Sequence, residues 1–282
     1  YLGFKGNAAY DRLWEARKIW GGIVNTSRTW GAQVTTYVGR NHPDHWDDVA
    51  KPALHQELVY RHVAWLAALR TQLRRDRPWE HHDGSDEHWR HTYGSDQQTP
   101  DHMRERMKDL LDPEELDWVM ARRNQATQLL HRQMVRIAEL RDRGLLDEFE
   151  HLQLAGCVEE FYTLMGKCER IKNFPLPRQY ASLNHWFVLL YLFFVPFGLV
   201  RAFDDLPADE LIWLTIPAHM VLSWVFYMWD MVVDQSENPF EGLQNDIPMT
   251  TISRAIEIDL REMLGETDLP PDAPQPAPNI QM

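Results

Sequence analysis

WFVLLYLFFVPFGLV at Trp186–Val200 and LIWLTIPAHMVLSWVFYMW at Leu211–Trp229 are two long apolar stretches in the last third of this chain. The second is close to the roughly 20 apolar residues that an α-helix needs to cross a bilayer, and the first reaches that length if its helix begins near Gln179. Residues 201–210 join them through a short polar link that is rich in acidic side chains. The sequence therefore predicts an antiparallel pair of transmembrane helices over about 179–234.

Charged residues on either side of this pair predict its orientation. The link is net acidic, whereas several basic residues precede the first stretch: Lys167, Arg170, Lys172 and Arg178. Because basic residues favour the cytoplasmic side of a membrane, we expect the link to lie outside and both flanks to lie in the cytoplasm. The prediction is a multi-pass protein of the inner cell membrane with most of its mass in the cytoplasm.

The rest of the chain is polar and acidic. Its 42 Asp and Glu residues outnumber 29 Lys and Arg residues among 282, which gives a formal net charge of -13. Nucleic-acid binding needs clustered basic residues, so we expect no nucleic-acid partner. Cys157 and Cys168 are the only cysteines and lie about 16 Å apart if they share one helix, too far for a disulfide, so we expect both to be reduced and buried.

Start signals, stop signals and apolar spacing predict an all-α fold. Helices are expected at about 10–38, 55–75, 112–143, 146–173 and 252–264. No segment shows the alternation typical of a strand. The motif Asp112-Pro113-Glu114-Glu115 combines a capping residue, a proline at the first helical position and acids in the first turn.

Prolines predict one break and one tail. In Pro175-Leu176-Pro177 two prolines forbid the preceding helix from continuing. Residues 266–282 contain five prolines and predict a disordered or extended tail.

A histidine-rich segment at about 78–107 interrupts the helical pattern and predicts an inserted loop. His88 and His91 are weak candidates for metal ligands, because imidazole suits zinc or nickel and two histidines three apart can share a helix face. A solvated loop without metal is the simpler interpretation. The same two alternatives apply to His42 and His45.

Short motifs follow one another along the chain in a fixed order. They are LGF at 2–4, YDRLWEAR at 10–17, LVYRH at 58–62, CERIKNFPLP at 168–177, PFGL at 196–199, ENPF at 237–240 and ND at 245–246. In this order they resemble the bestrophin family, in its bacterial branch. The resemblance covers most of the chain except the insert and the tail, and it implies a single bestrophin-like channel domain over 1–265.

The resemblance implies a homopentameric ion channel in the lipid bilayer, whose membrane helices are continuous with a large cytoplasmic helical domain. Its central pore for monovalent ions would have two apolar constrictions, a neck and a cytoplasmic aperture. Phe4 matches the last residue of the neck, and the other neck residues and a first transmembrane segment would precede Tyr1. Leu176 matches the aperture residue. A leucine between two prolines has a restricted backbone, so a ring of five could form a fixed apolar constriction that controls passage by dewetting.

Charged residues bear on which ion would pass. Arg178 follows the aperture, and five copies would form a cationic ring unless each pairs with an acid such as Glu169. The acidic chain and the bacterial-type motifs slightly favour cations, and an anion (chloride) channel of the same architecture is the alternative. We expect Asp230 and Asp234 to pair with a basic residue of a neighbouring helix. Animal members of the family carry a run of acids after this Asn-Pro-Phe motif, whereas too few acids follow Phe240 here for a calcium cage, so we expect no gating by calcium. We also expect no cofactor.

Two other classes of protein stay open. One is a membrane-bound metal-binding protein or enzyme that uses the histidine-rich insert, although its histidines lie in a predicted loop with no matching outer shell of partners. The other is a non-conducting membrane scaffold. We favour the channel and expect no catalytic residue.

Overall fold

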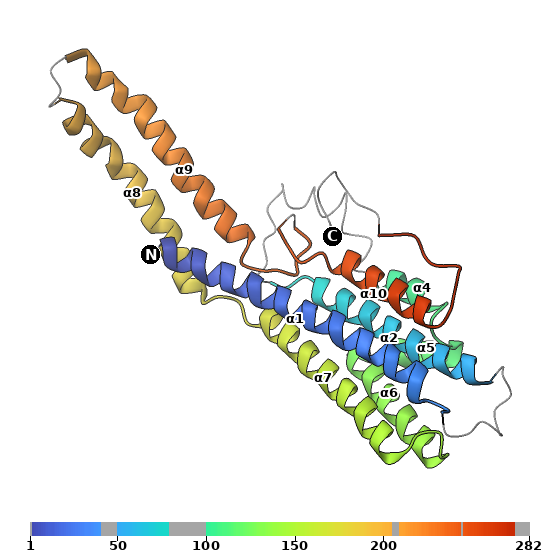
Figure 1. The fold of residues 1–282 in the computed structure, drawn as a ribbon. Coiled ribbons are helices and arrows are strands. Elements are labelled where there is room, and N and C mark those ends of the chain that lie inside the picture. Colours follow the sequence, from blue (N-terminus) through green and yellow to red (C-terminus); the bar gives the residue numbers. More distant parts are fainter. Residues whose placement is uncertain (1, 41–49, 79–99, 205–208, 244, 274–282) are drawn as a thin grey trace. The chain divides into compact units, whose positions relative to one another are not determined.

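A computed structural model describes residues 2–40, 50–78, 100–204, 209–243 and 245–273 (Figure 1). All regular structure within these ranges is helical and none is strand, which confirms the predicted all-α fold.

Contacts between residues divide the chain into two compact units. The first unit consists of Tyr1–Glu15 and Phe174–Pro239. The second consists of Ala16–Asn173 and Phe240–Met282. Helix α1 (Leu2–Tyr37) contributes its first turns to the first unit and its remainder to the second.

The first unit contains the predicted pair of apolar helices. Helix α8 (Arg178–Asp204) and helix α9 (Thr215–Gln235) run side by side, and the 3-10 helix η2 (Asp209–Leu214) precedes α9 (Figure 1). Leu183–Asp204 and Ile212–Gln235 are long and apolar enough to cross a membrane. Only 6% and 11% of their most apolar windows are buried, unlike the core helix of a soluble protein.

Large apolar side chains of this pair face outward, and two of its polar side chains are buried. Phe197, Trp213 and Trp224 expose 66%, 70% and 64% of their surface, whereas Asn184 and Asp230 are buried. A large exposed apolar surface marks a membrane or partner contact, and polar groups inside a membrane face the protein interior. The pattern is therefore the one expected of helices that lie in lipid.

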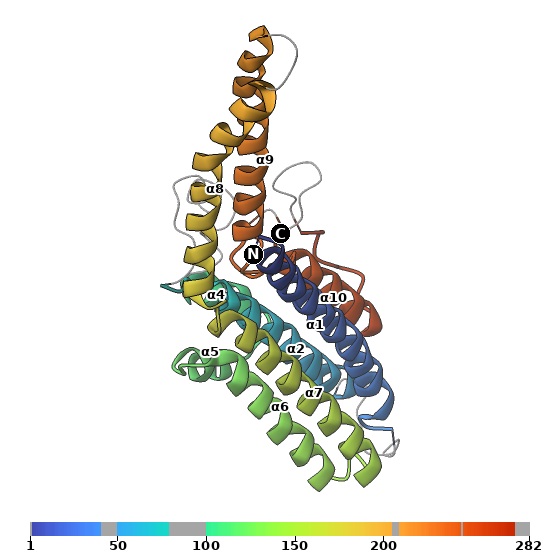
Figure 2. The same ribbon diagram turned by 90° about the vertical axis from the view of Figure 1, so that its left-hand side faces the viewer.

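The second unit is a bundle built around helix α2 (Ala50–Arg74). The other helices of this unit, besides α1, are α4 (Pro100–Met107), α5 (Pro113–Met120), α6 (Gln125–Asp142), α7 (Glu148–Asn173) and α10 (Met249–Met263). Helix α2 lies between α6 and α10 in both views (Figures 1 and 2). This position explains why α2 is buried along most of its length, on its polar side chains as well as its apolar ones.

Aromatic rings form the centre of this bundle. The ring of Phe161 lies 4.4 Å from the ring of His62 and 5.0 Å from that of Trp65, centroid to centroid. His62 is buried, and its Nε2 lies 2.9 Å from the hydroxyl of Ser27. Burial lowers the pKa of His62 to about 3, so the imidazole packs as a neutral ring.

The single helix expected over 112–143 is wrong, because the structure has two helices there. Helix α5 ends at Met120 and α6 begins at Gln125. Between them Asn124 caps α6, and its Oδ1 accepts a hydrogen bond from the backbone N–H of Thr127 at 3.0 Å. A capping residue has a non-helical backbone, so one helix cannot run through it.

The end of the predicted insert is helical, and the start of the predicted tail is hydrogen-bonded to the second unit. The last eight residues of the insert, 100–107, are helix α4. At the start of the tail, Glu266 accepts hydrogen bonds from Arg261 Nε at 2.6 Å and from the hydroxyl of Tyr60 at 2.9 Å. Residues 79–99 and 274–282 lie outside the described residues.

The two cysteines are free and buried, as expected. Burial raises the pKa of the Cys157 thiol and that of the Cys168 thiol. Both therefore remain protonated at neutral pH and pack as small apolar groups.

Candidate functional site

The proline break lies where it was predicted. Helix α7 ends at Asn173, residues 174–177 are not helical, and α8 begins at Arg178. Leu176 is partly exposed within this break, and Phe174 exposes 70% of its surface. Two prolines fix the backbone on either side of Leu176, so its side chain is presented from a restricted segment.

Arg12 of helix α1 holds the start of this break. Its Nη1 donates a hydrogen bond to the carbonyl oxygen of Phe174 at 2.6 Å, and its Nε donates one to the carbonyl oxygen of Glu237 at 3.0 Å. Burial lowers the pKa of the Arg12 guanidinium, while the charges of Glu237 and Glu15 act in the opposite direction. One side chain thus ties the segment that carries Leu176 to the chain that follows α9.

A partly buried polar cluster connects α1 with the apolar pair. Lys5 Nζ lies 2.7 Å from Asp234 Oδ1 and 3.8 Å from Asp230 Oδ1. Asn184 Nδ2 donates to Asp230 Oδ1 at 2.9 Å, and His185 Nδ1 lies 3.1 Å from Asp230 Oδ2. The prediction that Asp230 and Asp234 pair with a basic residue of a neighbouring helix is confirmed.

Phe4 lies on α1, one residue before this cluster. It exposes 69% of its surface, although it is a large aromatic residue. The adjacent Lys5 is buried, so this turn of α1 packs its lysine inward and leaves its phenylalanine on the surface of the first unit.

Three predicted site residues have side chains outside the described part of the structure. The backbone of Arg178 begins α8, but the position of its side chain is not described, so no pairing with Glu169 is assigned. His88 and His91 fall within 79–99. Among the described residues, no group of three or more His, Cys, Asp or Glu side chains could hold a metal ion.

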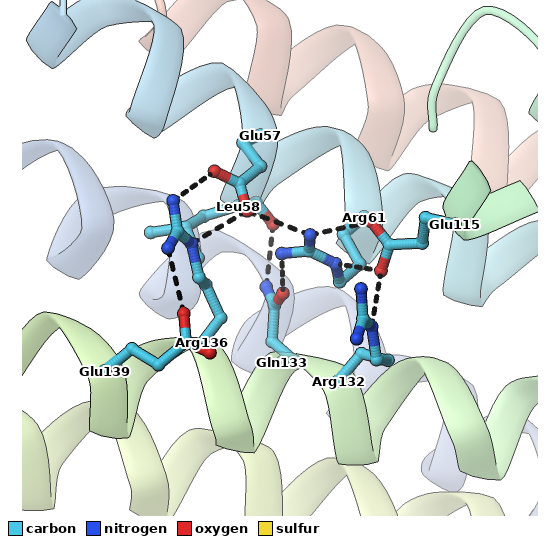
Figure 3. Close-up of polar contacts among 8 residues, drawn as sticks. All are labelled: Glu57, Leu58, Arg61, Glu115, Arg132, Gln133, Arg136 and Glu139. Atoms are coloured by element: carbon cyan, nitrogen blue, oxygen red, sulfur yellow. Dashed lines mark hydrogen bonds and ion pairs between the residues drawn. The ribbon is translucent and has the colours of Figure 1, made fainter. Parts of the chain in front are cut away.

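A network of charged side chains in the second unit was not predicted (Figure 3). Arg61 of α2 donates through Nε to Glu115 Oε1 at 2.7 Å and through Nη2 to Glu115 Oε2 at 2.8 Å. Its Nη2 also reaches Glu57 at 2.9 Å, and Glu57 in turn accepts from Arg136 at 2.8 Å. The signal for this network was the arginine in the motif LVYRH, which the structure places between α2, α5 and α6.

The network also fastens the backbone of α2. Gln133 of α6 accepts from Arg61 Nη1 at 3.2 Å and donates through Nε2 to the carbonyl oxygen of Leu58 at 2.7 Å (Figure 3). The side chains of Arg61 and Glu115 are each only 6% exposed. Arg132 Nε also donates to Glu115 Oε1 at 3.4 Å. Both members of the buried ion pair therefore have further hydrogen-bond partners, which is the condition for tolerating such a pair.

The Asn-Asp motif near 245 shapes a tight loop. Asp246 Oδ2 accepts hydrogen bonds from the backbone N–H groups of Gly242 at 2.5 Å and Leu243 at 3.1 Å, and Arg74 Nη1 lies 3.8 Å away. Gly242 has φ of 97°, which a residue with a side chain rarely adopts. Burial raises the pKa of Asp246 to about 7, against the lowering effect of Arg74. In this arrangement the carboxylate serves the local backbone.

Comparisons with known proteins relate the whole chain to one family. Residues 1–262 match the family described as Bacterial/Fungal Bestrophin protein. The voltage-dependent anion channel-forming protein YneE of Salmonella typhimurium is 28% identical over 270 residues, which cover 96% of this chain and 74% of the relative. The voltage-dependent anion channel-forming protein RSc3414 of Ralstonia nicotianae is 28% identical over 273 residues, or 97% of this chain and 76% of the relative.

A solved structure shares the fold. A crystal structure of a bacterial bestrophin homologue from Klebsiella pneumoniae, carrying one substitution, has 25% sequence identity and a TM-score of 0.74. The match covers 94% of this chain and 83% of that one. Because the family match extends over nearly the whole sequence, this chain belongs to the bacterial and fungal bestrophin family.

Proposed function

We propose that this protein is an ion channel, a homopentamer in which residues 1–265 of each copy form one channel domain around a central pore. Family membership and the names of its relatives support an ion channel rather than an enzyme. In this proposal monovalent ions cross an apolar neck at Phe4 and an apolar aperture at Leu176.

The break between α7 and α8 carries this proposal. Leu176 is an apolar residue on a segment that two prolines make stiff, and Arg12 holds the first carbonyl of that segment at 2.6 Å. Around a five-fold axis such a segment would present a ring of five leucines with little freedom to move. A ring of apolar groups controls ion passage because water leaves a narrow apolar constriction. Phe4, exposed on α1, supplies the same chemistry at the neck.

The membrane topology follows from the two spans and the flanking charge. The exposed apolar surfaces of α8 and α9 support a location in the membrane. The basic residues before α8 support a cytoplasmic position for the second unit and an outer position for the link between the spans. We assign the protein to the inner cell membrane on this basis.

We propose further that cations pass more readily than anions. The formal charge of -13 per chain supports this choice, because a net negative protein concentrates cations near its openings. Anions are the second candidate, since the relatives carry anion channel in their names. Arg178 follows the proposed aperture by two residues, and a ring of five arginines in the pore would oppose cations. If the side chain lines the pore, Arg178→Gln should therefore raise the permeability to cations.

Single-channel recording of Leu176→Ala tests the aperture. Removing the isobutyl groups widens the proposed ring and keeps it wet, so conductance should rise. Leu190→Ala is the matched control, because Leu190 lies on α8 and is 53% exposed away from the break. Equal conductance in wild type and both variants would remove Leu176 from the pore.

A further inference from the structure

A cavity of about 630 Å³ lies in the second unit, between α2, α4 and α10. Four arginines line it: Arg70 of α2, Arg106 of α4, and Arg254 and Arg261 of α10. The conduction path and the network of Figure 3 make no use of these four side chains. A concentration of guanidinium groups around one cavity is typical of an anion-binding site.

Two of the four arginines are balanced by acids. Arg254 Nη1 lies 2.9 Å from Glu257 Oε2, and Arg261 Nε lies 2.6 Å from Glu266 Oε2. Glu257 Oε1 also lies 3.8 Å from Arg261 Nη1. The charge of α10 toward the cavity is therefore largely neutralised within the protein.

Arg70 and Arg106 differ from this pair. In the described part of the chain neither makes an ion pair with a carboxylate, and Nη2 of Arg70 has no hydrogen-bond partner although it is buried. Arg70 is only 2% exposed. Burial lowers the pKa of both guanidiniums, and neighbouring arginines lower each of them further, while the charge of Glu257 acts in the opposite direction. Because arginine keeps its proton in proteins, both guanidiniums stay charged. Glu105 and Asp109 also line the cavity, and Glu105 pairs with Lys108.

The other arginines of α2 show how unusual Arg70 is. Arg61 pairs with Glu115 at 2.7 Å, and Arg74 lies 3.8 Å from Asp246. Both of these arginines are buried, and each has the acidic partner that a buried charge needs. A buried guanidinium without a partner destabilises the fold, and a bound anion would remove that cost.

We propose that this cavity binds a small phosphate-bearing anion, and that Arg70 and Arg106 hold its phosphate group. Two guanidiniums match the charge of a phosphate dianion and can each donate two parallel hydrogen bonds to it. A soluble phosphate compound and the headgroup of an anionic lipid offer the same chemistry. The site does not depend on ion conduction.

Calorimetric titration with inorganic phosphate at constant ionic strength tests the site, using the full-length protein in phosphatidylcholine nanodiscs. Arg106→Gln should weaken phosphate binding about tenfold or more, since it removes a charged hydrogen-bond donor. Arg104→Gln is the matched control, because Arg104 lies on the same helix, pairs with Asp117 at 2.8 Å and is absent from the cavity wall. This control should bind phosphate as the wild type does.

Arg70→Met gives a second, independent measurement. It removes an unpaired buried charge and keeps an apolar stem, so the thermal midpoint without phosphate should not fall. Phosphate should raise the midpoint of the wild type but no longer that of this variant. A wild type that fails to bind phosphate, or Arg106→Gln and Arg104→Gln variants with equal affinity, would overturn the proposal.

A second set of nanodiscs containing phosphatidic acid separates the two sources of phosphate. Unchanged affinity for inorganic phosphate in these nanodiscs identifies a soluble ligand. Weaker affinity in these nanodiscs identifies a lipid headgroup that already occupies the cavity. Both results support the site and differ only in its occupant.

Discussion

Replacing Glu115 with glutamine should lower the free energy of unfolding by about 3 kcal/mol. Glu115 receives two hydrogen bonds from Arg61, at 2.7 and 2.8 Å, and both side chains are only 6% exposed. At an effective dielectric constant of about 20, two charges roughly 4 Å apart attract each other by about 4 kcal/mol. Much of that attraction offsets the cost of taking both charges out of water. The variant loses the attraction while Arg61 remains buried.

The neighbours of Arg61 set the size of this effect. Breaking a buried ion pair on one side costs about 3–5 kcal/mol. Arg61 keeps its contact with Glu57 at 2.9 Å, so we expect the lower end of that range. Replacing both partners, Arg61→Met with Glu115→Leu, should restore stability to within about 1 kcal/mol of wild type, because no buried charge is then left alone.

Asp117 on the same helix provides the control. It pairs with Arg104 at 2.8 Å, nearly the same distance, but the two side chains are 69% and 49% exposed. Asp117→Asn should therefore cost less than about 1 kcal/mol. Denaturant unfolding of the full-length protein in detergent measures both variants. Equal losses of unfolding free energy in Glu115→Gln and Asp117→Asn would refute the reasoning that burial makes the Arg61–Glu115 pair more important for stability than an exposed pair.

Three smaller predictions concern the second unit. Asn124→Ala should destabilise the protein by about 1 kcal/mol, measured by thermal unfolding, because α6 loses its cap, while Asn124→Asp should keep it. Gly242→Ala should destabilise it more, because φ is 97° there and the new Cβ would lie 2.6 Å from Arg74 Nη1; a neutral result would contradict the backbone assignment. Burial raises the pKa of Asp246 to about 7, above roughly 4 in the unfolded chain. The native state therefore binds the extra proton between these values, so this group's contribution to stability is full below pH 4 and is lost as pH rises toward 7. Asp246→Asn should remove that slope from the unfolding free energy, and an unchanged slope would assign it to other groups.

Local signals were sufficient for the pair of apolar helices and for the proline break. The pair was predicted at about 179–234, and α8 and α9 extend from Arg178 to Gln235. Apolar length alone determines such helices, because a bilayer requires about 20 apolar residues whatever the rest of the protein does. The effect of the two prolines around Leu176 is also local, because each proline lacks the N–H that a helical hydrogen bond needs and so ends the helix where it occurs.

Contacts between distant residues could not be predicted in this way. Arg61 and Glu115 are 54 positions apart, and the sequence around each of them does not indicate which residue its partner is. Asn124 did carry a usable signal, since asparagine is a favoured capping residue, but the strong start at Asp112 led to one long helix. Among the described residues Arg70 has no acid partner, and this becomes visible only when the acids around it can be located in space.

Reversal potential across a NaCl gradient is the measurement that tests the proposed function most directly, with the full-length protein in planar lipid bilayers. The account predicts currents that reverse near the sodium equilibrium potential and grow in the Leu176→Ala variant. Reversal near the chloride equilibrium potential would contradict the proposed preference for cations but would still support an ion-conducting pore. Absence of current from well-formed pentamers, in wild type and in the Leu176 variant alike, would contradict the channel itself.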